Sequence, residues 1–174
     1  MGIHTKLNAV LLPETVEGIV ELTAAADTVP ADIRFIELMP IGAGKGRKGL
    51  PASEALERLR TRWPDLEPTG ERRGNGPGRY YGSTSLRARV GLISAVSRAF
   101  CSSCNRVRLT STGELKPCLC YGGGTDLRAL LRNGGTDRAL REAMACCILQ
   151  KPDAHGFGEG GAVTEARGMH EIGG

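Results

Sequence analysis

The sequence is poor in aromatic side chains and has no long hydrophobic run. Phe, Trp and Tyr make up only 4% of the 174 residues, so stacking platforms for single-stranded nucleic acid are not expected. No segment approaches the roughly 18 apolar residues that a membrane-spanning helix needs. The amino terminus also shows no basic-then-apolar secretory pattern. We therefore expect a cytoplasmic protein that binds neither a membrane nor a nucleic acid.

The charge balance is only mildly basic. The net charge is +4 and the isoelectric point is near 8.8, which suits a partner with phosphate groups but is too weak to indicate a nucleic-acid binder. Hydrophobic residues make up 40% and charged residues 24%, which are the proportions of a globular chain. In the cytoplasm the six cysteines are expected to be reduced thiols or metal ligands rather than disulfides.

The first forty residues predict a strand, a helix and a second strand. Apolar and polar residues alternate over 5–12, apolar residues recur at helical spacing over 14–26, and a β-branched and aromatic run covers 32–39. Two strands joined by one helix are parallel, with a right-handed crossover. One such unit cannot complete a sheet, so the chain is expected to begin inside an α/β fold.

The rest of the chain predicts short elements between glycine-rich loops. The expected elements are a helix over 53–62 with Ser53 as its N-cap, a strand over 87–93, a hairpin of 106–110 and 115–119, a helix over 126–132 and a helix from Thr136 to 151. The breaker-rich stretches 40–51 and 64–78 are expected to be loops, and 153–174 an irregular tail.

Three cysteines have the spacing of a metal site. Cys101 and Cys104 form a CxxC turn, and Cys118 follows on the return strand of the predicted hairpin. Three thiolates that converge suit zinc or an iron–sulfur cluster. The spacing alone favours zinc, with His155 or His170 as fourth ligand, then an iron–sulfur cluster, then ordinary thiols.

Several other residues have a plain structural interpretation beside a functional one. Arg106 and Arg108 would share one face of a strand, where two guanidinium groups either grip phosphates or meet solvent. Lys6 and Arg34 lie on the two parallel strands, where charged residues are unusual. They either point into a functional cavity or mark an exposed edge. Cys146 and Cys147 are interpreted as part of a buried helix face.

At these residues the sequence resembles a known family. The run Phe100–Thr110 (FCSSCNRVRLT), followed by Gly113, Leu115 and Cys118, is similar to the C-terminal cluster motif of the GTP 3′,8-cyclase family, radical S-adenosylmethionine enzymes of molybdopterin biosynthesis. Further matching segments are Lys6–Val10, Arg34–Gly42, Tyr80, Gly91–Ser94, Asp126–Arg128, Lys151–Pro152, Arg167, Met169 and the terminal Ile172–Gly174. The resemblance extends from about residue 3 to the end of the chain.

The resemblance implies a fold and a cofactor. Residues 1–50 would form the C-terminal strands of an incomplete radical S-adenosylmethionine α/β barrel, and residues 51–174 an α+β cluster region with a Gly-Gly tail. Cys101, Cys104 and Cys118 would hold a [4Fe–4S] cluster with one open iron, which binds the purine of GTP. The family converts GTP to (8S)-3′,8-cyclo-7,8-dihydroguanosine 5′-triphosphate.

The resemblance also implies roles for residues outside the cluster. The expected GTP-binding residues are Lys6, Arg34, Arg106, Val107, Arg108, Gly173 and Gly174, and Met39 is expected to touch S-adenosylmethionine. A second copy of the chain is a candidate partner.

The sequence departs from the family in one large respect. It contains no CxxxCxxC motif, which in the family holds the cluster that cleaves S-adenosylmethionine. We therefore expect the chain to be the substrate-binding half of such an enzyme and to be inactive alone. The alternatives are a zinc-stabilised binding module and a non-functional remnant, the latter with an exposed strand edge over 5–12.

Overall fold

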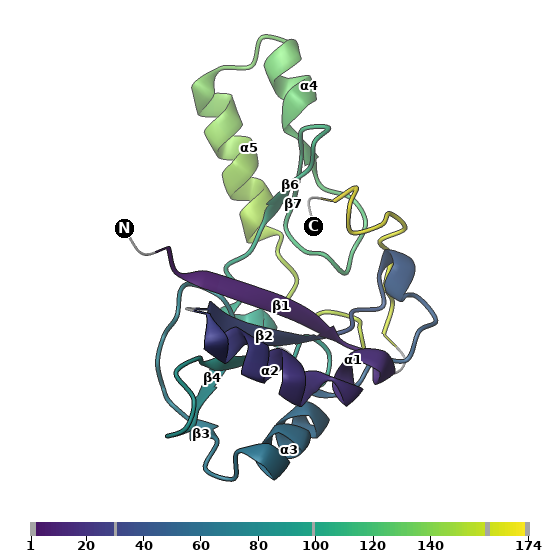
Figure 1. The fold of residues 1–174 in the computed structure, drawn as a ribbon. Helices are drawn as coiled ribbons and strands as arrows, with labels where there is room; N and C mark the ends of the chain where they lie inside the picture. The colour runs from purple at the N-terminus through teal and green to yellow at the C-terminus, as the bar shows by residue number, and fades with distance from the viewer. Residues whose placement is uncertain (1–2, 30, 99, 159–160, 173–174) are drawn as a thin grey trace. The chain divides into compact units, whose positions relative to one another are not determined.

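A computed structural model describes residues 3–29, 31–98, 100–158 and 161–172 (Figure 1). Contacts divide the chain into two compact units. The first unit comprises Met1–Met39 and Lys48–Phe100, and the second comprises Pro40–Arg47 and Cys101–Gly174. The boundary at residue 50 that the resemblance implies stays a prediction.

The elements of the first unit are β1 (Thr5–Leu11), α1 (Pro13–Glu17), α2 (Ile19–Thr28), β2 (Ala31–Glu37), α3 (Ala52–Arg62), β3 (Glu67–Pro68), β4 (Arg79–Gly82) and β5 (Val90–Ile93). Those of the second unit are two short 3-10 helices (Gly42–Gly44 and Cys101–Ser103), β6 (Arg108–Leu109), β7 (Glu114–Lys116), β8 (Thr125–Asp126), α4 (Leu127–Arg132) and α5 (Asp137–Leu149).

The first unit is built on a five-stranded mixed sheet with the strand order β1-β2-β5-β4-β3. β1 pairs with β2 in parallel along its whole length, from Thr5 opposite Ala31 to Leu11 opposite Glu37, which confirms the predicted parallel strands. β2 is also parallel to β5, whereas β4 is antiparallel to both of its neighbours. The mixed α/β class is thus confirmed, and closure into part of a barrel stays a prediction.

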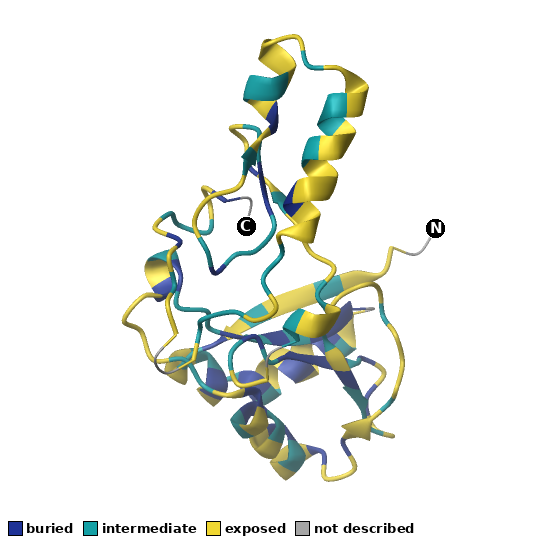
Figure 2. Cartoon of the chain, turned by 180° about the vertical axis from the view of Figure 1, so that it is seen from behind, coloured by how far each residue is buried: buried dark blue, intermediate teal, exposed yellow. Residues whose placement is uncertain are grey.

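One face of this sheet forms the core of the first unit. Ile33 and Phe35 of β2 and Val90 and Leu92 of β5 are buried in one cluster, because alternate residues of a strand point to the same side. Helices α1, α2 and α3 supply most of the rest of the cluster, together with Leu11 of β1 and the loop residues Trp63, Leu66 and Leu86. Figure 2 shows buried segments, in dark blue, on the sheet and the helices of this unit. The expected helix over 14–26 is in fact two helices, with Gly18 between α1 and α2.

A buried carboxylate ties three segments of the first unit together. Glu37, 3% exposed at the end of β2, accepts a hydrogen bond from the Ala52 amide at 2.8 Å. Its other oxygen accepts from the Val96 amide at 2.8 Å and the Ser97 amide at 2.7 Å. Helix α3 therefore begins at Ala52 with Pro51 in the N-cap position, and the prediction of Ser53 as N-cap is wrong, because a distant carboxylate takes the place of a local cap.

We expect Glu37→Gln to destabilise the protein by about 1–3 kcal/mol, because the new amide would direct N–H groups at backbone donors that it cannot satisfy. Burial alone would raise the pKa of Glu37, but the Ser97 hydroxyl and the backbone amides lower it below its ordinary value, so the carboxylate is the form that the site holds. Urea unfolding measures the change. Glu57→Gln, on the exposed side of α3, is the control, and equal midpoints for both variants would contradict the assignment.

The second unit contains the predicted hairpin in a shorter form. β6 and β7 pair antiparallel, with Arg108 opposite Lys116 and Leu109 opposite Leu115, and β8 adds a third strand. Gly113 in the turn has a φ of 84°, and a Cβ atom there would come within 2.6 Å of the Arg128 side chain. A residue other than glycine would therefore both strain the turn and clash with α4.

Two helices complete the second unit as the sequence predicted. Asp126 caps α4 through a 2.8 Å hydrogen bond from the Ala129 amide, and Thr136 caps α5 through a 3.2 Å bond from the Ala139 amide. Only one of the two mid-helix cysteines is buried: Cys147 is 1% exposed, whereas Cys146 is exposed. None of the helices in the described ranges is long and apolar enough to cross a membrane.

Candidate functional site

The second face of the sheet in the first unit carries polar side chains. The register puts Lys6, Asn8 and Arg34 on the side opposite to the Ile33 and Phe35 core. Nε of Arg34 donates a 2.8 Å hydrogen bond to Oδ1 of Asn8. The two cations that are unusual for parallel strands therefore lie together on the face away from α2 and α3.

An aromatic ring and a glycine shape the surroundings of these cations. Tyr80 of β4 is opposite Gly91 of β5, and Nζ of Lys6 lies 5.9 Å from the centre of the Tyr80 ring. The same ammonium donates to the backbone oxygen of Arg73. A Cβ atom at Gly91 would lie 3.0 Å from both the Arg34 and the Tyr80 side chains, so the glycine leaves room for both of them.

The two other parts of the expected site are Met39 and the terminal glycines. Met39 is half-buried and follows β2 by two residues, at the carboxyl end of a parallel strand, where α/β folds bind ligands. Gly173 and Gly174 lie outside the described residues. The tail before them is anchored within the second unit, where Ile172 is fully buried and Nζ of Lys45 donates to the Glu165 carbonyl at 3.0 Å.

The three expected metal ligands lie in the second unit as half-buried free thiols. Cys101 opens a short 3-10 helix, and its carbonyl accepts a 3.0 Å hydrogen bond from the Cys104 amide, which closes the CxxC turn. Cys118 follows β7 by two residues. In the described part of the chain, no three Cys, His, Asp or Glu side chains form a group that could hold a metal ion, so the ligand set stays a proposal.

A fourth thiol belongs to the same region. Cys120 is fully buried, and its amide donates to Sγ of Cys118 at 3.5 Å. Burial is the main cause that raises the pKa of Cys120, and the charges of Cys118 and Cys101 raise it further. The pKa of Tyr121 is also raised, mainly by burial and by the charge of Cys120, and to a smaller extent by the charges of Cys118 and Cys101.

A cavity of about 410 Å³ opens beside Cys118. Its wall includes Pro117, Cys118 and Tyr121 on one segment, Cys147 of α5, and the backbone of Gly122–Gly124. The room lies next to an expected metal ligand, and its glycine wall allows a bound group to approach the backbone closely.

The two expected phosphate-binding arginines influence each other. Arg106 is exposed and lies before β6, whereas Arg108 is half-buried and opens that strand. Burial lowers the pKa of Arg108, and the positive charge of Arg106 lowers it further. Val107 between them is 41% exposed.

Lys151 connects the segments that carry the cysteines and the arginines. Its ammonium donates to the carbonyl of Pro117 at 2.7 Å, directly before Cys118. It also donates to the carbonyl of Arg106, two residues after Cys104. One side chain thus holds the CxxC segment and the Cys118 segment together. The sequence marked Lys151 only through the resemblance, because its two partners are distant in the chain.

A buried ion pair fixes the turn after Cys118 to the tail of the chain. Nζ of Lys116, 0% exposed, lies 2.5 Å from Oε2 of Glu165, 2% exposed. The ammonium also donates to the carbonyls of Tyr121 at 3.1 Å and Gly123 at 3.0 Å. Arg167 continues the network, with Nη1 at 2.6 Å from Glu114 and Nε at 3.1 Å from Glu165.

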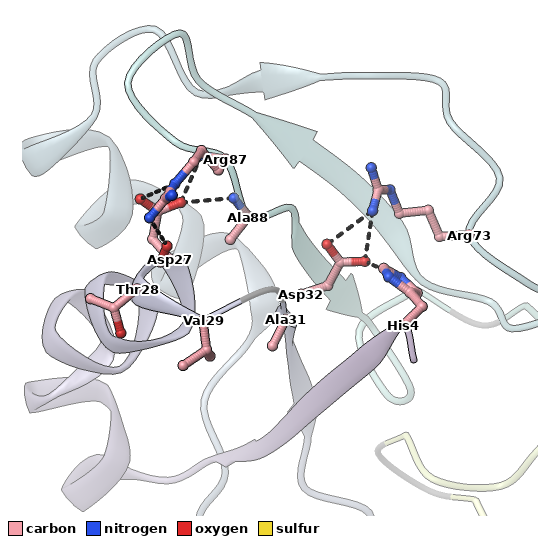
Figure 3. A pocket seen from close by; sticks show the side chains of 9 residues that line it. All are labelled: His4, Asp27, Thr28, Val29, Ala31, Asp32, Arg73, Arg87 and Ala88. Carbon is pink, nitrogen blue, oxygen red and sulfur yellow. Dashed lines mark hydrogen bonds and ion pairs between the residues drawn. The ribbon is translucent and has the colours of Figure 1, made fainter. Parts of the chain in front are cut away.

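Another cavity, of about 360 Å³, lies in the first unit at the amino ends of β1 and β2 (Figure 3). Asp32 lies in its wall, and both of its carboxylate oxygens accept a hydrogen bond of 3.0 Å from Nη1 of Arg73. Its Oδ2 also lies 2.9 Å from Nε2 of His4. Asp27 accepts from the backbone amides of Arg87 and Ala88. These carboxylates are thus satisfied within the wall, and ligands of α/β folds bind at the opposite strand ends, so we assign this cavity a structural role.

The fold and these residues agree with what sequence comparison shows. Residues 31–157 match the family described as Molybdenum Cofactor Synthesis C, and the chain belongs to that family. It is homologous to the C-terminal region of GTP 3′,8-cyclases, which confirms the resemblance found in the sequence.

Three relatives illustrate the extent of the similarity. The chain is 40% identical to the GTP 3′,8-cyclase of Clostridium perfringens strain SM101, with 99% of this chain and 54% of the relative covered. For the GTP 3′,8-cyclase of Rhodobacter capsulatus the identity is 39%, with 99% and 55% covered. For GTP 3′,8-cyclase 2 of Mycobacterium bovis it is 37%, with 97% and 49% covered. The chain thus spans about half the length of these relatives.

Proposed function

We propose that this chain is the substrate-holding part of a cytoplasmic GTP 3′,8-cyclase. It contributes a [4Fe–4S] cluster on Cys101, Cys104 and Cys118, and it binds GTP. The observation that carries the proposal is the arrangement of the second unit, in which Lys151 joins the segments of both cysteine groups beside the cavity at Cys118. Membership in the family supports the same function.

The donor set fits an iron–sulfur cluster. All three cysteines are free and half-buried, and they lie on a short turn and in the segment that follows β7. Thiolates are the ligands of such clusters, and a cluster held by only three of them leaves one iron open to a substrate atom. When bound, the cluster would supply that open coordination position. The residues of the chain would orient GTP around it.

The charge and placement of the cationic residues support a set of roles that we propose for them. We propose that Arg106 and Arg108 contact GTP, with Val107 lining the site, since two guanidinium groups held close together bind phosphate oxygens well. Lys6 would reach the phosphates and Arg34 would lie near them, and both lie on the polar face of the sheet. Met39 would contact S-adenosylmethionine in the whole enzyme, and Gly173 and Gly174 would enter the site.

The chain has no CxxxCxxC motif, so we propose that it holds the substrate and does not cleave S-adenosylmethionine. The isolated chain, supplied with GTP, S-adenosylmethionine and a reductant, should form no cyclised nucleotide. Detection of that product by mass spectrometry would refute this part of the proposal.

We expect Arg108→Ala to weaken GTP binding by about 10- to 100-fold, which corresponds to the loss of one or two charge-assisted hydrogen bonds. Anaerobic titration of the iron-loaded protein with GTP measures the affinity. Arg138→Ala is the matched control, because Arg138 is an exposed arginine on α5 whose ion pair is with Glu142. Equal affinities in Arg108→Ala and wild-type protein would contradict the role of Arg108.

Guanosine provides a second comparison. It lacks the phosphates, so its binding should be weaker than that of GTP and should change little in Arg108→Ala. A matching loss of affinity for guanosine and GTP would mean that Arg108 does not recognise the triphosphate.

A further inference from the structure

One buried nitrogen of the second unit has no hydrogen-bond partner. Throughout the described ranges, Nε2 of His155 is the one buried side-chain nitrogen or oxygen in this condition. A buried polar atom left without a partner destabilises a fold, and such atoms are rare in native proteins. A group that is bound to the protein in its working state would supply the missing partner.

The other ring nitrogen defines what kind of partner is needed. Nδ1 of His155 accepts a 3.2 Å hydrogen bond from the Phe157 amide, so Nδ1 carries a lone pair and not a proton. In the neutral imidazole the proton is then on Nε2, as inferred from this hydrogen bond. The ring also stacks on Phe157, with 4.6 Å between the centroids. The orphaned atom is therefore an oriented N–H donor, and its partner must be an acceptor.

The segment around His155 runs along the Cys118 turn. Lys151 reaches the Pro117 carbonyl, the Ala154 carbonyl accepts from the Tyr121 hydroxyl at 3.1 Å, and the Gly156 amide donates to Sγ of Cys120 at 3.1 Å. His155 thus lies between two residues that are themselves bonded to the turn after Cys118.

We propose that His155 donates its Nε2 proton in a hydrogen bond to a sulfur atom of the cluster held by Cys101, Cys104 and Cys118. This inference rests on the proposed function. The acceptor is a cluster sulfide or a ligating thiolate, and no atom or electron is transferred. Hydrogen bonds to the sulfurs help to set the reduction potential of such clusters, because they stabilise the more negative, reduced state. His155 is a positioning and tuning residue and does not ligate iron.

The same geometry argues against His155 as a zinc ligand. A nitrogen that carries a proton has no free lone pair for a metal, and release of that proton from Nε2 would require protonation of Nδ1 and loss of its bond from Phe157. A zinc site with His155 as its fourth ligand therefore needs a different arrangement of this ring, whereas a zinc site with His170 does not.

The test compares variants of this whole 174-residue chain, each reconstituted with iron and sulfide without oxygen. His155→Phe keeps a planar ring and removes the hydrogen-bond donor, whereas His155→Gln keeps a donor. His170→Phe is the control, because it removes a histidine whose side chain is 85% exposed. Iron and sulfide content and the midpoint potential from an EPR-monitored titration are measured for each. We expect equal iron in all proteins, a more negative potential in His155→Phe, partial recovery in His155→Gln, and no change in His170→Phe.

A measurement on the wild-type chain covers the case in which His155→Phe does not retain iron. With histidine labelled by ¹⁵N in the ring, pulsed ENDOR of the reduced cluster should detect a weak nitrogen coupling and an exchangeable proton coupling that is lost in D₂O. A missing nitrogen coupling, or an unchanged potential in an iron-loaded His155→Phe, overturns the inference while the cluster itself stands. A wild-type chain that binds one zinc and no iron overturns the proposed function as well.

Discussion

Cys118→Ser should abolish iron binding. Wild-type protein purified without oxygen is expected to hold about four irons and about four sulfides per chain, and the variant only a small residue of each. A hydroxyl is a poor ligand for iron in such clusters, and two thiolates of the CxxC turn alone leave half of the irons without a protein ligand. Iron and acid-labile sulfide analysis, together with the visible absorption of the cluster, measures the loss.

Cys146→Ser is the matched control for Cys118→Ser. Cys146 is also a free cysteine of the second unit, but it is exposed on α5, so its loss should leave the iron content unchanged. Full iron in Cys118→Ser would contradict the ligand assignment. One zinc and no sulfide in the wild-type chain would favour the zinc-stabilised binding module, and neither metal after reconstitution would favour the remnant.

Lys116→Met should destabilise the protein by about 1–3 kcal/mol, because the buried carboxylate of Glu165 loses its ammonium partner and keeps only Arg167. The tie between the Cys118 turn and the tail depends on this pair, since Lys116 also holds the carbonyls of Tyr121 and Gly123. Urea unfolding measures the change. The double variant Lys116→Met with Glu165→Gln should recover part of the loss, because it no longer buries a carboxylate that has lost its ammonium partner.

Glu165 also predicts how stability depends on pH. Burial alone would raise its pKa, but hydrogen bonds from Arg167 and Lys116 lower it from 4.5 to about 2. A carboxyl group whose pKa is lower in the folded state stabilises the protein above the unfolded value. This contribution is therefore complete above pH 4.5 and is lost as the pH falls from 4.5 toward 2.

Unfolding at pH 7, 5 and 3 compares Glu165→Gln with wild-type protein. The variant should lose less stability than wild type between pH 5 and 3, because it has no carboxylate to protonate at this site. Glu142→Gln removes an exposed carboxylate of α5 and should retain the wild-type pH dependence, because exposed ion pairs contribute little. Parallel curves for Glu165→Gln and wild type would contradict the role of the buried pair.

The sequence by itself determined the local elements and the family. The alternation over 5–12 and the β-branched and aromatic run over 32–39 predicted β1, β2 and their parallel pairing, and the segments 106–110 and 115–119 predicted the hairpin. The motif Phe100–Thr110 identified the family that the comparison shows. These properties depend on short-range patterns, namely side-chain periodicity, turn chemistry and motif spacing.

Only the tertiary structure decided which distant groups act on one another. Glu37 at the end of β2 caps α3, and Lys116 forms an ion pair with Glu165. Lys151 donates a hydrogen bond to the carbonyl of Pro117. His155 lacks a partner for Nε2, which no sequence pattern reveals. Each of these facts concerns burial or a hydrogen bond between residues far apart in the chain. Such contacts depend on how strands, turns and tail pack, because the low-dielectric interior strengthens every polar contact and makes each missing one costly.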